Sequence, residues 1–110
     1  GDNCSFQTGA YIPTGTKIGN RVFLGPNASL TNDKTPLRSE YTPEPITIGD
    51  DVTVGSNATI MPGLTLEEGA FVAGGAVVTK NVPAWHLAKG CPAVISKLPD
   101  SLKKPNRLGK

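Results

Sequence analysis

Residues 46–78 read ITIGDDVTVGSNATIMPGLTLEEGAFVAGGAVV, and a large aliphatic residue returns at every sixth position from Ile48 onward. Steps of six in both directions extend this series along the chain. It runs Phe6, Ile12, Ile18, Leu24, Leu30, Ile48, Val54, Ile60, Leu66, Val72 and Val78, with a lapse at Pro36 and Thr42. The residue two positions before each member is small or aliphatic, as at Ala28, Val52 and Ala76. A period of six fits neither the 3.6-residue repeat of a helix nor the unbroken alternation of a half-buried strand, so it predicts short strands separated by corners.

The predicted corners consist of residue types that accept left-handed backbone angles. They occur as Gly19-Asn20, Gly25-Pro26-Asn27, Gly49-Asp50-Asp51 and Gly55-Ser56-Asn57. Three six-residue units would close one triangular coil, and coils stacked about 4.8 Å apart would pair their backbones in parallel. We therefore predict an all-β fold, a parallel β-helix of hexapeptide repeats. Chance patterning in a β-sandwich is the weaker interpretation, because eleven positions keep the same phase.

The domain organisation follows from where this period holds. The length of 110 residues allows one small domain, and 13 glycines, 10 prolines and 5% aromatic residues suit stacked turns better than a bulky core. We predict repeats over residues 1–82 and a C-terminal cap with a basic tail over residues 83–110. The polar, proline-bearing residues 31–45 are predicted to loop outward from the wall, the alternative being an irregular coil that stays within it. The chain begins in mid-repeat, which suggests that earlier coils precede it.

Charge is concentrated at the end of the chain. The net charge is +2, but the last fourteen residues carry +4, from Lys97, Lys103, Lys104, Arg107 and Lys110 against Asp100. Such a tail could meet phosphates. Its interspersed prolines and glycine favour instead a solvated, poorly ordered terminus.

Several classes of protein are excluded or disfavoured. Cys4 and Cys91 are too far apart for a CxxC site, and with the single histidine, His86, they cannot close a structural zinc site. We therefore expect reduced thiols and no metal. No apolar run approaches about 18 residues and no signal-peptide pattern is present, which predicts a cytoplasmic protein. Neither a membrane nor a nucleic acid is an expected partner.

Three motifs carry a resemblance to a known family. They are Ile18-Gly19-Asn20-Arg21-Val22-Phe23-Leu24-Gly25-Pro26-Asn27-Ala28, Ile48-Gly49-Asp50-Asp51-Val52-Thr53-Val54-Gly55 and Gly75-Ala76-Val77-Val78-Thr79-Lys80-Asn81-Val82-Pro83. From about residue 2 to residue 96 the chain resembles the hexapeptide-repeat acyltransferases, which implies a left-handed parallel β-helix. Within that family, residues 30–34 with Pro36 and Arg38 look most like the N-acetyltransferases that act on nucleotide-linked amino sugars in bacterial surface-polysaccharide biosynthesis. The resemblance implies acetyl-coenzyme A (acetyl-CoA) as co-substrate, an amino-sugar acceptor and a homotrimer with its active sites between subunits.

The catalytic candidates follow from the absence of a loop histidine. Other branches of the family use one as general base, because an alcohol is a weak nucleophile until it loses its proton. Here the only histidine, His86, lies in the expected cap, where a surface or packing role is the better interpretation. A neutral amine is already nucleophilic, so positioning can replace strong base catalysis, which favours N-acetylation.

The resemblance places Asn32 beside the acceptor amine, where its amide could also stabilise the developing oxyanion. Asp33 would receive a proton or orient the sugar, and Lys34 and Arg38 would bind the substrate. Asn32 and Asp33 could equally form a loop-entry turn, because both residue types bond to their own backbone.

For the cofactor, the family pattern points to Gly55, Ser56, Ala73, Gly74 and Gly75, whose small side chains would let pantetheine approach the backbone. Plain turn chemistry is the alternative. Lys80 and Lys89 would meet the cofactor phosphates as point charges. Ala73-Gly74-Gly75 and Gly90-Cys91-Pro92 depart from the family pattern.

Two alternatives to N-acetylation are kept. One is O-acetylation of a sugar or another small hydroxyl acceptor, with Asp33 as the base. The other is a non-catalytic β-helix that serves as a trimerisation module. A carbonic anhydrase of this fold would need a histidine triad, which a single histidine excludes.

Overall fold

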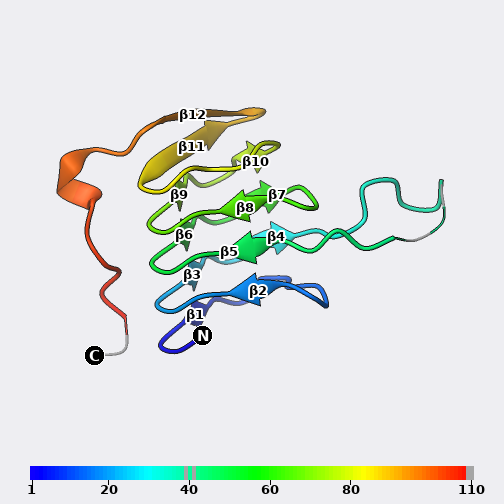
Figure 1. The fold of residues 1–110 in the computed structure, drawn as a ribbon, viewed down its shortest axis with the longest axis horizontal. Helices are drawn as coiled ribbons and strands as arrows, with labels where there is room; N and C mark the ends of the chain where they lie inside the picture. Colours follow the sequence, from blue (N-terminus) through cyan, green and yellow to red (C-terminus); the bar gives the residue numbers. More distant parts are fainter. Residues whose placement is uncertain (39, 41, 109–110) are drawn as a thin grey trace.

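The computed structural model describes residues 1–38, 40 and 42–108, and in it the chain winds into stacked coils (Figure 1). The strands are β1 Ser5–Phe6, β2 Lys17–Ile18, β3 Phe23–Leu24, β4 Ser29–Leu30, β5 Thr47–Ile48, β6 Thr53–Val54, β7 Thr59–Ile60, β8 Thr65–Leu66, β9 Phe71–Val72, β10 Val77–Val78, β11 His86–Gly90 and β12 Ala93–Lys97. A short 3₁₀ turn, η1, covers Asp100–Leu102. Among the described residues, no helix is long and apolar enough to cross a membrane.

The strands form three sheets, one for each side of the triangular coil. Sheet A has the order β1-β3-β6-β9-β11-β12, sheet B the order β10-β7-β4, and sheet C the order β2-β5-β8. All pairs are parallel except β11 with β12, which are antiparallel. The prediction of an all-β, left-handed parallel β-helix is confirmed.

From β3 to β10, each two-residue strand buries its second side chain in the core. The register stacks Leu24 on Val54 and Val54 on Val72, so like residues lie above like, and all three are fully buried. The six-residue series is buried from Leu24 onward. Phe6 differs and is 46% exposed, because it lies in β1, the terminal strand of sheet A. The core is therefore a narrow column of stacked aliphatic side chains.

Three stacked corners join the sheets. The A–B corner contains residues 25–27, 55–57 and 73–75; the B–C corner contains residues 31–45, 61–63 and 79–81; and the C–A corner contains residues 19–21, 49–51, 67–69 and 83–85. The third residue of each A–B turn is left-handed, with φ of 61° at Asn27, 61° at Asn57 and 73° at Gly75. This is the backbone conformation that glycine and asparagine adopt most readily.

Between β4 and β5, the described residues extend away from the stacked coils (Figure 1). Backbone hydrogen bonds close the neck of this loop. The Glu44 N–H donates to the Asn32 carbonyl at 2.8 Å, and the Gly63 N–H donates to the Glu44 carbonyl at 2.8 Å. The loop therefore leaves and rejoins the wall at one point.

The stacking continues beyond residue 82. Val82 bridges Leu66, and in β11 Leu87 and Ala88 pair with Phe71 and Val72 of β9. Strand β12 then folds back on β11, and residues beyond it run back along the stack toward the first coil (Figure 1).

Candidate functional site

Apart from Lys89, which lies in β11, the residues expected to form the site lie at the two corners that flank sheet B. The expected cofactor residues, from Gly55 to Gly75, occupy the A–B corner, whereas the loop and Lys80 belong to the B–C corner. Asn32 follows β4 and Lys80 follows β10, with β7 between these strands. Two strand spacings separate them, roughly 10 Å along the stack.

At the A–B corner, Gly55 and Gly75 have different surroundings. A Cβ at Gly55 would press against the backbone of Gly74 in the next coil, so the close stacking of the coils accounts for Gly55. The Gly75 N–H donates to the Ser56 carbonyl at 2.8 Å. A Cβ at Gly75 would meet no atom within 4 Å, so this position faces open space. Coil stacking therefore explains Gly55, while Gly75, whose φ of 73° is the left-handed conformation of a turn, also has room for a ligand.

At the loop neck, Asn32 and Asp33 are both half-buried but are held differently. The Asn32 side-chain Nδ2 lies 3.5 Å from the carbonyl oxygen of Thr14 in the coil below. Asp33 Oδ1 accepts the Thr35 N–H at 3.1 Å, which is the local turn that an aspartate commonly forms. This bond gives Asp33 a structural role in shaping the loop entry.

The two expected substrate-binding cations lie on the projecting part of the loop. Lys34 and Arg38 are both exposed. The Arg38 N–H donates to the Thr35 carbonyl at 3.1 Å, so residues 35–38 form a turn in the projecting part of the loop. Leu37, within this turn, is fully exposed and left-handed, with φ of 61°.

Lys80 lines a pocket of about 450 Å³ at the top of the B–C corner. The lining residues are Thr79, Lys80, Pro92, Ala93, Val94 and Ile95. Lys89 pairs with Val94 across the β11–β12 hairpin and is exposed. The pocket combines a cation with apolar walls. Sequence reasoning missed residues 92–95, because only the antiparallel return of β12 brings them beside Thr79.

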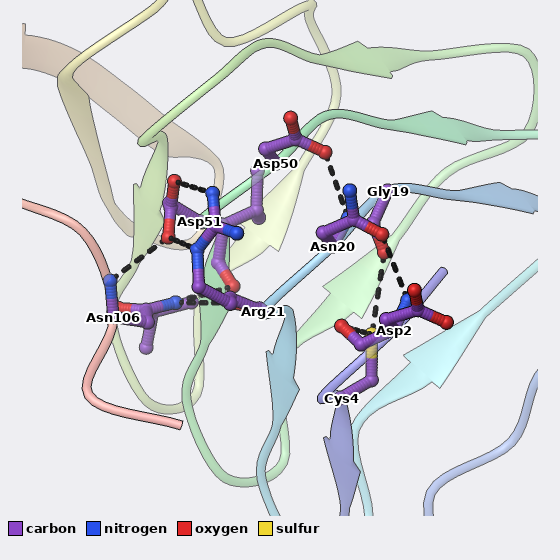
Figure 2. Close-up of polar contacts among 10 residues, drawn as sticks. Asp2, Cys4, Gly19, Asn20, Arg21, Asp50, Asp51 and Asn106 are labelled. Carbon is purple, nitrogen blue, oxygen red and sulfur yellow. Dashed lines mark hydrogen bonds and ion pairs between the residues drawn. The ribbon is translucent and has the colours of Figure 1, made fainter. Parts of the chain in front are cut away.

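A separate polar network occupies the C–A corner (Figure 2). Arg21 Nε and Nη2 donate to Asp51 Oδ1 and Oδ2 at 2.8 and 2.9 Å. Asn106, from the C-terminal segment, donates its backbone N–H to Asp51 Oδ1 at 2.9 Å. The hydrogen bond from Arg21 lowers the pKa of Asp51 from its ordinary value, although burial opposes this effect. The expectation of a solvated terminus is wrong at Asn106, which the structure anchors to Asp51, a residue that is 4% exposed.

The same corner continues into the first coil. Asn20 Oδ1 accepts the Asp2 N–H at 2.8 Å, and Asp50 Oδ1 accepts the Asn20 N–H at 2.7 Å (Figure 2). The Cys4 thiol lies 3.2 Å from the Gly19 carbonyl oxygen. Side chains and backbone thus link successive coils at this corner.

The remaining chemically active residue types form no metal centre in the described structure. Cys4 and Cys91 are free thiols. His86 is half-buried in β11, with its Nδ1 2.8 Å from the Ala84 carbonyl oxygen. Within residues 1–38, 40 and 42–108, no three His, Cys, Asp or Glu side chains are grouped so that they could hold a metal ion.

A sequence family described as "Hexapeptide repeat of succinyl-transferase" matches residues 45–80. The chain is also 40% identical over 97 residues to a Schizosaccharomyces pombe protein named "Putative acetyltransferase C18B11.09c". That match covers 83% of this chain and 45% of the relative, so the chain spans about half the length of this curated protein.

Solved structures share the fold. A hexapeptide-repeat acetyltransferase from Vibrio cholerae superposes with a TM-score of 0.79 at 30% identity, covering 90% of this chain and 61% of that one. The same Vibrio protein is also known in complex with acetyl-CoA. A maltose O-acetyltransferase from Clostridium difficile 630 gives a TM-score of 0.76 at 27% identity, covering 88% and 56% of the two chains.

Proposed function

We propose that the chain is part of an acyltransferase that takes its acetyl group from acetyl-CoA. The comparisons support the hexapeptide-repeat acetyltransferase family, and the proposal starts from that family. The observation that carries this proposal is the pocket beside Lys80, at a corner that flanks sheet B. A lysine among the lining residues of a largely apolar pocket suits a ligand that joins phosphates to an apolar arm.

The residues around sheet B fit such a co-substrate. Gly75 faces open space, so an extended pantetheine arm could approach the backbone there. Lys80 and Lys89 supply positive charge at the end of the stack where β10 and β11 lie. Ser56, Ala73 and Gly74 complete the proposed cofactor wall, whereas Gly55 contributes through coil stacking.

For the acceptor, we favour the amine of a nucleotide-linked amino sugar. The only histidine of the sequence lies in β11, outside the loop, and an amine needs no strong base. The neutral amine would attack the thioester carbonyl carbon, the carbon–sulfur bond would break, and coenzyme A would leave as the thiolate. The amine proton would pass to Asp33 or to water.

Within this reaction, Asn32 would hold the amine and donate from Nδ2 to the developing oxyanion. Lys34 and Arg38, exposed on the projecting loop, would bind the phosphates of the acceptor. We further propose a homotrimer in which each loop reaches toward a neighbouring subunit, so that the site is completed between chains.

O-acetylation is the second candidate, favoured by the similarity to a maltose O-acetyltransferase. An alcohol acceptor requires a base, and Asp33 is the carboxylate at the loop entry. Its engagement with the Thr35 N–H weighs against this role.

The test is an acceptor panel on the purified full-length protein, with release of the free coenzyme A thiol as the readout. Nucleotide-linked amino sugars are compared with their hydroxyl counterparts and with simple alcohols. Turnover with amino sugars alone supports the proposal, and turnover with alcohols alone replaces it by O-acetylation. Calorimetry with acetyl-CoA completes the design, because absence of saturable binding would indicate a non-catalytic trimerisation module.

A further inference from the structure

The C-terminal residues 99–108, here called the strap, lie against the C–A corner without joining a sheet. They follow Leu98, which is 2% exposed, and pass through η1 before running along the stack (Figure 1). None of the residues of η1 is buried, and beyond η1 only Asn106 and Leu108 are half-buried. The strap therefore packs little apolar surface.

One residue makes the polar contacts that attach the strap. In the described part of the chain, every hydrogen bond between residues 99–108 and the stacked coils involves Asn106. Its backbone N–H donates to Asp51 Oδ1 at 2.9 Å, and its Nδ2 donates to the carbonyls of Arg21 and Val52 at 2.8 and 3.2 Å. Its Oδ1 accepts the Thr53 hydroxyl at 3.1 Å.

The partners of Asn106 belong to two different coils. Arg21 lies between β2 and β3, whereas Asp51, Val52 and Thr53 lie at the start of the next coil. Asn106 thus links these coils to the last segment of the chain, over the ion pair that already joins Arg21 to Asp51 (Figure 2).

We propose that the strap opens and closes on the C–A corner as a unit, with Asn106 as its latch, and that the closed strap restrains the two coils that begin with β3 and β6. Opening breaks four hydrogen bonds at one residue and little else, so the strap can leave while sheets B and C stay intact. It also exposes the Asp51 carboxylate and leaves it with Arg21 as its remaining side-chain partner.

Hydrogen–deuterium exchange resolved by residue tests the proposal on the full-length protein. In the wild type, the amide of Asn106 should be protected, but less than the amide of Val54 in the buried wall. Asn106→Ala should raise exchange at position 106 and at Arg21 and Phe23 by about tenfold or more, since several hydrogen bonds are lost together. The amides of Thr59 and Val77, in sheet B, should be unaffected.

Lys104→Ala is the matched control, because Lys104 is an exposed strap residue and should leave all these rates unchanged. Asn106→Asp is a second variant that keeps the side-chain size, replaces Nδ2 by an oxygen facing the Arg21 and Val52 carbonyls, and should also open the strap. Wild-type exchange at position 106 as fast as in an unstructured chain would overturn the proposal. So would unchanged protection in both Asn106 variants, or protection at position 106 that is lost only together with that of Val54.

Discussion

Arg21 and Asp51, thirty residues apart in sequence, join neighbouring coils through a two-point ion pair in which the Asp51 side chain is 2% exposed and the Arg21 side chain 35% exposed. A carboxylate so enclosed has exchanged water for the guanidinium and for the Asn106 N–H. Removing one partner of such a pair lowers the free energy of unfolding by more than the intact pair contributes to it, because the other charged group stays enclosed without an opposite charge.

Replacing Asp51 should therefore destabilise the fold. We expect Asp51→Ala to lower the free energy of unfolding by about 2 kcal/mol, below the range for fully buried pairs because Arg21 keeps access to water. Urea unfolding followed by circular dichroism measures this change. Asp100→Ala is the control, since the Asp100 carboxylate is 97% exposed beside Lys103, and its loss should cost no more than about 0.5 kcal/mol. Equal effects of the two substitutions would contradict the prediction.

The pH dependence of stability should carry the signature of Asp51. Its pKa is lowered in the folded protein, chiefly by the hydrogen bond from Arg21, relative to about 3.9 for an unfolded aspartate. The contribution is therefore complete above the unfolded value and is lost as pH falls through the folded value. The stability difference between wild type and Asp51→Asn should stay constant from about pH 7 to pH 5 and shrink below about pH 4. A difference that grows on acidification would refute this.

Two left-handed glycines allow backbone strain and side-chain overlap to be separated. At Gly69, with φ of 71°, an added Cβ would overlap the ring of Trp85, whereas at Gly75, with φ of 73°, it would meet nothing. We expect Gly75→Ala to cost about 1 kcal/mol from backbone conformation alone. Gly69→Ala should cost about 3 kcal/mol, because overpacking adds to that strain. Thermal unfolding without ligand compares the two, and equal costs would show that Trp85 moves aside freely.

The proposed cofactor pocket makes Lys80 a test of binding. We expect Lys80→Ala to weaken acetyl-CoA binding about fivefold, the effect of one partly exposed ion contact, and to reduce the salt dependence of the affinity. Isothermal titration calorimetry at two ionic strengths measures both. Lys17→Ala, in β2 of sheet C, is the control of equal charge away from the pocket. If both variants weaken binding equally, general electrostatic attraction accounts for the effect.

Asn32 and Asp33 should differ in kinetics if the acceptor is an amine. Asn32→Ala should lower kcat by roughly 100-fold through loss of an oxyanion donor. Asp33→Asn keeps an oxygen that can accept the Thr35 N–H and should retain most of the activity. The acceptor identified by the panel serves as substrate. Abolished turnover in Asp33→Asn would instead favour O-acetylation with Asp33 as base.

The repeat was predictable because its information is local and recurs. Each coil carries the same alternation, so Leu24, Val54 and Val72 could be assigned to the core by phase alone, and all are fully buried. Phase could not account for Phe6, whose burial depends on how many coils surround it rather than on its own position.

Contacts between distant segments were beyond such reasoning. Asn106 and Asp51 are 55 residues apart, and no local pattern marks an asparagine in a basic tail as the partner of a corner aspartate. The lining of the pocket beside Lys80 likewise depends on the return of β12 along β11. For the site itself, the structure distinguishes Gly55 from Gly75 by their surroundings, whereas the catalytic roles of Asn32 and Asp33 stay predictions.

The closed neck of the loop has a consequence for how such a chain can diversify. Asn32 and Glu44 are hydrogen-bonded to each other, and Glu44 is hydrogen-bonded to Gly63. The two ends of the loop are therefore held at the same place on the stacked coils, whatever number of residues lies between Asn32 and Glu44. Length and composition of that segment can then vary through insertion, deletion or exchange without disturbing the stack below and above. The β-helix can therefore keep its stacked coils while this loop changes, and loops from relatives could be grafted between Asn32 and Glu44 to test whether the loop selects the proposed acceptor.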